Sequence, residues 1–404
     1  MPSRRISLVD VLLWLVGIVA ALVLIALFLS ASKRQAPAPV DQAIVLVTPT
    51  FTPAASATAE NVWQIIVTPT PGGELYLRPT VVYSTPLPVI YPPPRPRAAF
   101  DFGGHVLDFK APDQMAYAGM KWVKFQVHEG DNDAADKIAR GHGKGFKVLL
   151  GVVGDVNRVA DPTYYPQFAA YVGSLAAGGA DAIEIWNEPN IARDWPSGQI
   201  SPTLYIDFLR PSYQAIKAAN ANTLVITAGM AATLMAQNLR TPNFWAEVDY
   251  TTEFVLQGGL LYADCVGVHY NIGITAPDYS EAAPTGDAAF FYYPRILEHY
   301  ANITRGTRPL CFTEFGYLTD DGYPPLSQVA PDFGWAQNNT IQDQAQWFAQ
   351  AVKLASANPQ VEMFIVWNVD FWSYGADPHA GYAIIRQDGG CPACEALHGL
   401  GLGG

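Results

Sequence analysis

Eight short apolar runs, spaced through residues 99–372, constrain the fold of this chain most strongly. Their apolar residues are nearly continuous rather than alternating, a pattern typical of strands in a parallel sheet whose two faces are covered. Stretches with helical periodicity, such as 164–177, 204–219, 288–303 and 342–357, lie between most of them. The runs are AFDFGGHV (99–106), KWVKFQVH (121–128), FKVLLGVVG (146–154), DAIEIWNE (181–188), LVITAGM (224–230), CVGVHYN (265–271), LCFTEFGY (310–317) and VEMFIVWNVDFW (361–372).

Alternation of eight strands with helices over about 300 residues predicts one α/β domain, 99–404, with the fold of a (β/α)8 TIM barrel. A doubly wound open sheet is the alternative. That fold usually carries a glycine-rich phosphate-binding loop after an early strand, and no GxGxxG stands in such a place here. The barrel is therefore the better prediction.

Residues 1–35 have the composition of a membrane anchor. Arg4 and Arg5 precede residues 11–29, a run of 19 residues without charge. At about 1.5 Å per residue, a helix of this length just crosses a hydrocarbon core of roughly 30 Å. We expect an uncleaved transmembrane helix at about 11–29. The alternative is a secretory signal peptide cleaved near Ser30 or Ser32, although the apolar core of such a peptide is usually shorter, about 7–15 residues.

Residues 36–98 form a linker or stalk rich in proline and threonine. Thirteen of the chain's 32 prolines fall within it, and that composition disfavours a packed core. Two apolar patches, AIVLV at 43–47 and VWQIIV at 62–67, fit a solvated linker poorly. We expect these patches to form a small hairpin or to pack on the main domain.

The net charge of residues 99–404 is −15, because the whole chain carries −12 while 1–35 contribute +3 and 36–98 contribute none. A domain this acidic is a poor candidate for binding nucleic acid, which depends on neutralising phosphates. The same charge disfavours polyanionic polysaccharides. A neutral ligand or substrate is the simpler expectation.

The four cysteines fall into two pairs. If both strands alternate regularly, Cys265 points into the barrel while Cys311 points outward to the helices, so we expect two buried free thiols. Cys391 and Cys394, in the sequence CPAC, predict a disulfide across a small loop. A zinc site that includes His398 is the weaker alternative, because a second CxxC is missing.

Polar and aromatic residues gather where the predicted strands end, and the C-terminal ends of barrel strands carry the active site. Two are glutamates, Glu188 in IEIWNEPN and Glu314 in LCFTEFGY. Glycosidic-bond hydrolysis needs two such carboxylates, one protonated and one ionised. The other residues at these strand ends are His128, Asp155, Asn187, His269, Tyr270, Trp367 and Asn368.

The two glutamates need different surroundings. Glu188 has to be protonated at rest, so we expect its pKa to be raised by the charge of Glu314 and by desolvation from Trp186. Glu314 has to stay ionised, and His269 and Tyr270 are the expected hydrogen-bond donors. A carboxyl separation of about 5–5.5 Å would mean retention of configuration, and about 6.5–9.5 Å would mean inversion.

The candidates for contacts with a sugar are Asn187, His269, Tyr270, Trp367, His128, Asp155, Trp186, Trp195 and Trp372. The Asn187 amide is expected to donate to a sugar 2-hydroxyl. Trp195 and Trp372 follow strands four and eight and can stack on pyranose rings, or they can simply anchor their loops. For His128 and Asp155 two roles are left open, contact with the substrate and capping of a loop.

The run WNEPN, with TEFG farther along the chain, resembles clan A of the glycoside hydrolases, retaining (β/α)8 enzymes such as families 5 and 39. The resemblance implies that Asn187 and Glu188 are the pair that ends strand four, with Glu188 as acid/base. It also implies that Glu314 is the nucleophile at the end of strand seven.

The resemblance extends to the neighbours of the glutamates. His269 and Tyr270 match the strand-six position beside the nucleophile, and Trp367 matches the strand-eight tryptophan that floors the sugar subsite. One departure stands out, because many relatives carry an arginine near the end of strand one or two. This chain offers Lys124 instead, which we expect to pair with Glu184 inside the barrel.

These features together predict a membrane-anchored retaining glycosidase that cleaves β-glycosidic bonds by double displacement and requires no metal or other cofactor. Its expected partner is a neutral extracellular oligo- or polysaccharide. The expected location is the cell membrane, as a single-pass protein with the catalytic domain outside the cytoplasm, or the exterior after signal cleavage. The alternative is a catalytically inactive barrel that serves as a cell-surface carbohydrate-binding or adhesive protein.

Overall fold

The structure is a computed structural model, and it describes residues 65–69, 75–79, 93–96, 98–233, 239–279 and 286–402. The predicted membrane helix at 11–29 lies outside these residues, as does most of the predicted stalk. Among the residues that are described, no helix is both long enough and apolar enough to cross a bilayer.

Two compact units make up the chain, Met1–Leu87 and Pro88–Gly404. Within the first, strand β1 (Ile65–Pro69) pairs antiparallel with β2 (Leu75–Pro79). This antiparallel pair agrees with the expected small hairpin and includes 65–67 of the second apolar patch. The first patch, 43–47, lies outside the described residues.

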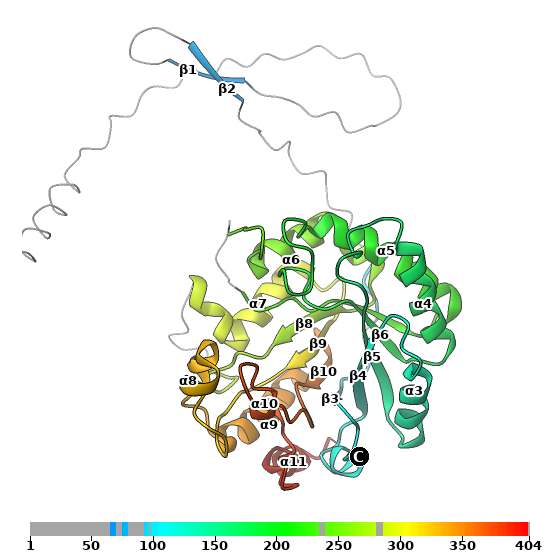
Figure 1. Cartoon of the computed structure of the whole chain (residues 1–404), viewed down its shortest axis with the longest axis vertical. Coiled ribbons are helices and arrows are strands. Elements are labelled where there is room, and N and C mark those ends of the chain that lie inside the picture. Colours follow the sequence, from blue (N-terminus) through cyan, green and yellow to red (C-terminus); the bar gives the residue numbers. More distant parts are fainter. Residues whose placement is uncertain are drawn as a thin grey trace, which may run out of the picture. The chain divides into compact units, whose positions relative to one another are not determined.

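In the second unit, the described residues form eight parallel strands in the order β7-β6-β5-β4-β3-β10-β9-β8 (Figure 1). A parallel bridge between Ile226 and Cys265 joins the two end strands and closes the sheet. The predicted (β/α)8 barrel is therefore confirmed, and each strand lies within one of the predicted runs. The strands are β3 (Asp101–Val106), β4 (Trp122–His128), β5 (Lys147–Val153), β6 (Ala182–Ile185), β7 (Leu224–Thr227), β8 (Val266–Tyr270), β9 (Leu310–Phe315) and β10 (Val361–Val366).

Helices surround the barrel on its outer side (Figure 1). The four helical stretches expected from periodicity appear as α4, α5, α7 and α9, with α7 starting later because 286–291 form a 3-10 turn. A capping box starts α9, in which the Thr340 hydroxyl accepts from the Asp343 N–H at 3.1 Å. The helices are α2 (Pro112–Tyr117), α3 (Ala134–Gly143), α4 (Tyr165–Ala177), α5 (Pro202–Ala219), α6 (Glu247–Leu256), α7 (Tyr293–Thr304), α8 (Leu326–Val329), α9 (Ile341–Ala357), α10 (His379–Tyr382) and α11 (Pro392–His398).

The chain enters the barrel unit at the N-terminal ends of the strands. The Arg95 guanidinium donates to the Asp264 carbonyl, just before β8, at 2.9 Å, and it forms an ion pair with Glu362 at the start of β10. Arg308, just before β9, donates to the Pro93 carbonyl at 2.6 Å. Residues 93–96 are therefore fixed at the end of the barrel opposite to the C-terminal ends of the strands.

A small apolar cluster fills the barrel interior toward these N-terminal ends. The barrel interior near the C-terminal ends of the strands is left to polar side chains. The apolar cluster therefore forms the floor beneath any site at that open end, which is the mouth of the barrel. The cluster consists of Trp122, Leu149, Ala182, Ile226, Cys265, Cys311, Met363 and Ile365.

The prediction of two free thiols at Cys265 and Cys311 is wrong, because the two form a disulfide with a Cα–Cα distance of 5.9 Å. Strand β9 holds one residue more than β8 along their ladder, since Phe312 and Glu314 face successive residues of β8. Around the extra residue, Thr313, the regular alternation fails. Cys311 and Glu314 consequently both point into the barrel, although their separation of three predicts opposite faces.

The C-terminal cysteines form the predicted disulfide, Cys391–Cys394, at the start of α11. The third residue of the alternative zinc site has another role. His398 places its ring parallel to that of Tyr117, with centroids 4.1 Å apart, and its Nδ1 lies 2.8 Å from the Tyr117 carbonyl.

Candidate active site

The chain turns sharply where β6 ends. Trp186 and Glu188 have φ values of 75° and 31°, which are uncommon for residues with a side chain and cost about 1–3 kcal/mol each. Trp186 packs edge-on against Phe208 on the helix side, with its indole N–H on the Asp194 carbonyl at 2.6 Å. The Glu188 N–H donates to the Gly229 carbonyl at 3.2 Å. These contacts hold the turn that directs Glu188 into the mouth.

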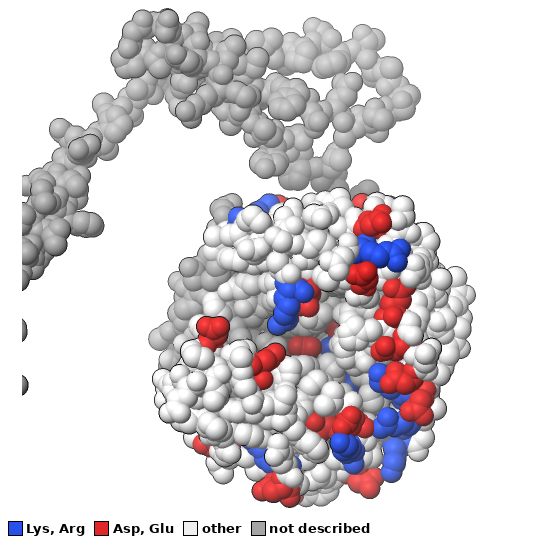
Figure 2. Space-filling model, in the orientation of Figure 1, with Lys and Arg blue, Asp and Glu red and all other residues white. Residues whose placement is uncertain are grey.

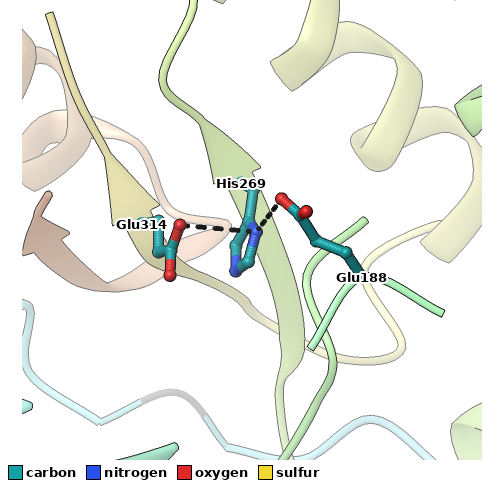
Figure 3. A group of neighbouring side chains, drawn as sticks. All are labelled: Glu188, His269 and Glu314. Carbon is teal, nitrogen blue, oxygen red and sulfur yellow. Dashed lines mark hydrogen bonds and ion pairs between the residues drawn. The ribbon is translucent and has the colours of Figure 1, made fainter. Parts of the chain in front are cut away.

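His269, from β8, lies between the two glutamates that the sequence singled out (Figure 3). Its Nδ1 is 3.0 Å from Glu188 Oε1 and 3.7 Å from Glu314 Oε2. One oxygen of each glutamate and one ring nitrogen all lie within 4.8 Å of one another. The structure thus brings together three of the predicted site residues.

The charge of His269 follows from its surroundings. Burial alone would lower its pKa, but Glu314, Glu184 and Glu188 raise the pKa of His269 to about 10. Glutamates and histidine are also metal ligands, but a ligating histidine must be neutral. A protonated His269 suits a site that works with carboxylates and protons.

Lys124, from β4, supplies a second buried cation. Its Nζ lies 2.7 Å from Glu184 Oε2 and 3.4 Å from Glu314 Oε1. Burial lowers the pKa of Lys124, but the two carboxylates more than offset this and raise it. The predicted Lys124–Glu184 pair is confirmed. The same ammonium also reaches Glu314.

Two further neighbours of Glu314 were missed at the level of sequence. Asn271 donates from Nδ2 to Glu314 Oε2 at 3.3 Å, and His105 places Nδ1 3.9 Å from Glu314 Oε1. Burial, with the charge of Lys124, holds the pKa of His105 well below its usual value, so this ring is neutral. The signal was available, because both residues end predicted strands.

Tyr270 is not the donor to Glu314 that we expected. Since His269 points into the barrel, the next side chain points outward. The Tyr270 hydroxyl donates to the Phe291 carbonyl at 2.7 Å, and its ring packs against Phe315 with centroids 4.8 Å apart. Tyr270 is fully buried there, which also excludes the predicted contact with a sugar.

The residues around the β6 turn serve mainly to anchor it. Asn187 donates from Nδ2 to Asp194 Oδ2 at 3.0 Å, so its amide is already engaged. Trp186 and Trp195 are buried in an aromatic cluster, and Trp195 donates to the Gln199 carbonyl at 2.8 Å. The prediction that Trp195 stacks on a sugar is therefore wrong, and the alternative of a loop anchor holds.

The two tryptophans after β10 differ in position. Trp367 is half-buried and meets the His105 ring edge-on at 4.9 Å, which places it beside Glu314. Its role as a floor for a sugar stays a prediction. Trp372 donates to the Ile385 carbonyl at 3.2 Å, and the Lys110 ammonium lies 5.3 Å from its ring centre, contacts that anchor its loop.

His128 is the last residue of β4 and Asp155 lies in the loop after β5, and both are exposed. The His128 N–H donates to the Asp131 carboxylate at 2.8 Å, while Asp155 accepts from the Asn157 N–H at 2.9 Å. Of the two readings left open, loop capping is the one these contacts support. Within the described part of the chain, neither side chain contacts the two glutamates.

Arg193, in the loop after β6, is the functional candidate that the sequence did not reveal. It hydrogen-bonds Glu188 Oε2 and also donates to Asp194 Oδ2 at 3.2 Å. Burial raises the pKa of Glu188, but His269 and then Arg193 outweigh this, so the pKa is lowered. The expectation of a raised pKa at Glu188 is thus wrong for the protein without substrate.

The face shown in Figure 2 is hollowed, and acidic and basic side chains lie in the hollow and around its rim. Asp194 is one of the acidic groups beside Arg193. Burial raises the pKa of Asp194 to about 6, despite the charge of that arginine.

No family model matches the sequence, and no curated protein matches it. Solved structures do. A family 39 glycoside hydrolase from the gut symbiont Bacteroides cellulosilyticus WH2 aligns with a TM-score of 0.53 and 15% identity over 75% of this chain. The present chain spans 63% of the length of that protein.

Two other similar structures are a GH128 (subgroup II) endo-β-1,3-glucanase from Sorangium cellulosum and Cel5A from Thermotoga maritima in complex with cellobiose. The first has a TM-score of 0.47 and 14% identity over 74% of this chain and 97% of its own. The second has a TM-score of 0.48 and 13% identity over the same shares, 74% and 97%. At such identities the likeness is one of fold alone.

Proposed function

We propose that this chain is a retaining glycoside hydrolase that cleaves β-glycosidic bonds by double displacement. The observation that carries the proposal is the pair Glu188 and Glu314, which project from the ends of β6 and β9 with one oxygen of each within 4.8 Å. This bound, which holds for one oxygen of each carboxyl, is compatible with the roughly 5–5.5 Å between the carboxyl groups of retaining enzymes. Inverting enzymes need about 6.5–9.5 Å to admit a water molecule.

In the first step Glu314 is the nucleophile. Lys124 and Asn271, at 3.4 and 3.3 Å, stabilise its ionised form and orient it. A carboxylate oxygen attacks the anomeric carbon, the bond from that carbon to the glycosidic oxygen breaks, and Glu188 donates a proton to the departing oxygen. The product is a sugar esterified to Glu314.

In the second step the roles of Glu188 reverse. Glu314 has lost its charge in the ester, and Glu188 is now ionised. It takes a proton from a water molecule, whose oxygen attacks the anomeric carbon and frees Glu314. His269, which contacts both glutamates, stabilises whichever of them is negative at each stage.

The fold shared with the family 39 glycoside hydrolase supports this activity class. The net charge of the domain supports a neutral oligo- or polysaccharide substrate. Two disulfides support a location outside the reducing cytoplasm. We place the protein at the cell membrane through 11–29, with the catalytic domain outside, or outside the cell after signal cleavage.

The test is turnover by the purified full-length protein on aryl β-glycosides and on neutral β-glucans, xylans and mannans. Glu314→Gln and Glu188→Gln are each expected to lower kcat/KM by at least about three orders of magnitude for substrates with poor leaving groups. NMR should show the first-formed product with the β configuration of the substrate.

Equal activity in the wild type and Glu314→Gln would contradict the assignment. If no member of the panel is cleaved while glycans still bind, the inactive carbohydrate-binding or adhesive barrel becomes the better account.

A further inference from the structure

Both oxygens of Glu188 are occupied. Oε1 lies 3.0 Å from His269 Nδ1, and Oε2 accepts a hydrogen bond from Arg193. A general acid needs one oxygen that carries a proton and faces the glycosidic oxygen. Because both partners are cations that favour the ionised carboxylate, one of them has to withdraw before Glu188 can hold this proton.

Arg193 is the partner that can leave. His269 is fully buried and also held by Glu184 and Glu314, at 3.5 and 3.7 Å. The Arg193 side chain, in contrast, is 65% exposed. Because Arg193 covers the oxygen that is not bound to the imidazole, a sugar that approaches Glu188 from the solvent meets the guanidinium first.

A second site for the guanidinium already exists. Asp194 Oδ2 accepts from Nε and from Nη2 of Arg193, both at 3.2 Å. The backbone of the loop is fixed on both sides, since the Ala192 N–H donates to the Asn243 carbonyl and the Gly198 N–H to the Pro242 carbonyl, both at 2.7 Å. Only the side chain has to move.

The other charged groups around Glu188 do not offer this freedom. Asp194 is partly exposed and Asp377 is exposed, and Arg193 helps to lower the pKa of Asp377 after the larger effect of His379. The others are buried. When Arg193 is removed, fewer positive charges oppose the effect of burial, which raises the pKa of Glu188. The groups are His269, Lys124, Glu184, Glu314, Asp194, Glu247, Tyr382 and Asp377.

We propose that Arg193 is a positioning residue that keeps Glu188 ionised in the free enzyme and releases it, while staying bound to Asp194, when the leaving-group sugar enters the mouth. Glu188 then takes up, from solvent, the proton that it donates. This inference rests on the proposed function, because it concerns the timing of proton uptake by the acid of that reaction.

The experiment compares pH profiles, because the alkaline limb of kcat/KM reports the free enzyme and that of kcat reports the complex. In the wild type, the limb of kcat/KM should lie at lower pH than that of kcat. Arg193→Gln should move the limb of kcat/KM upward by at least about one pH unit, leaving the limb of kcat in place. Arg193→Lys keeps a positive charge and should therefore shift the alkaline limb of kcat/KM less than Arg193→Gln does.

Two controls separate this role from general effects of charge or folding. Arg295→Gln removes an exposed arginine, paired with Glu298 at 3.0 Å, and should leave both limbs unchanged. Asp194→Asn removes the second site and should lower kcat/KM at least about tenfold for oligosaccharides. It should spare 2,4-dinitrophenyl glycosides, whose leaving group needs no proton.

The inference would be overturned if the alkaline limbs of kcat and kcat/KM coincide in the wild type, or if Arg193→Gln does not move the limb of kcat/KM. The proposed function would still stand in either case, provided that turnover depends on Glu188. A wild type without any turnover, or a Glu188→Gln variant that still cleaves oligosaccharides, would overturn both.

Discussion

Lys124 and His269 place two positive charges among three carboxylates inside the barrel. Lys124 is 1% exposed and His269 is fully buried. Such groups are stable in the interior only as a set, because each charge left without its partner costs several kcal/mol. The position of His269 also requires a glycine at position 229, because a Cβ on Gly229 would lie 2.1 Å from the His269 ring.

Lys124→Met should destabilise the protein by about 3–5 kcal/mol, because Glu184 and Glu314 lose their common counter-charge. Chemical denaturation followed by circular dichroism measures the loss. Lys147→Met is the matched control: its ammonium lies 2.7 Å from Asp101 but is 53% exposed, so its removal should cost at most about 1 kcal/mol. Equal losses in both variants would argue against a buried charge network.

Glu247, on α6, makes stability depend on pH. Its carboxyl is fully buried, Oε1 accepts from the Tyr300 hydroxyl at 2.8 Å, and burial raises the pKa of Glu247 to about 8. Below pH 4.5 both states of the chain hold this proton. Between 4.5 and 8 the unfolded chain releases it while the folded protein retains it, so stability falls as the pH rises.

Glu247→Gln removes this titration. The free energy of unfolding of the wild type should therefore fall relative to that of the variant by on the order of 4 kcal/mol between pH 4.5 and 8. Urea denaturation at several pH values measures it, with the exposed Glu298→Gln as control. Parallel curves for wild type and Glu247→Gln would refute the prediction.

Two local irregularities decide which side chains reach the site. The extra residue in β9 turns both Cys311 and Glu314 inward, and the positive φ values at the end of β6 turn Trp186 outward and Glu188 inward. Neither leaves a mark in the hydrophobic pattern. Each is fixed by tertiary contacts, such as the Thr313 hydroxyl on Glu184 at 2.6 Å.

These irregularities explain how far the sequence could be interpreted. The runs of apolar residues predicted all eight strands, and the strand ends predicted Glu188, Glu314 and His269, because burial leaves a strong pattern. The pairing of Cys265 with Cys311 was missed, because the alternation of side chains is broken at Thr313 in β9. Trp195 was misplaced for another reason: composition cannot tell a loop aromatic that faces solvent from one that packs inward.

The Cys265–Cys311 disulfide joins neighbouring strands of the barrel, and its two cysteines are 46 positions apart in the sequence. Changing both cysteines to alanine should cost about 4 kcal/mol, because the unfolded chain gains the entropy that the bridge removed. The same change at Cys391 and Cys394, three residues apart, should cost about 2 kcal/mol. Thermal unfolding without reductant compares the two, and a larger loss for the short loop would contradict the expectation.

On the scale of the whole molecule, the N-terminal part is expected to determine location. The full-length chain should remain in the membrane fraction after carbonate extraction, because 11–29 can cross a bilayer. A chain that begins at Pro88 should be recovered in the soluble fraction with its activity intact. Recovery of an uncleaved full-length chain as a soluble protein would contradict the anchor, and a shortened soluble product would indicate signal cleavage.

The point at which the chain enters the barrel has a practical consequence. Arg95 and Arg308 fix residues 93–96 at the floor, whereas Glu188 and Glu314 open at the other end. A bead or chip coupled to the N-terminus of a chain that begins at Pro88 therefore leaves the mouth unobstructed. Ligands far larger than the domain can then reach the glutamates without meeting the support to which the protein is attached.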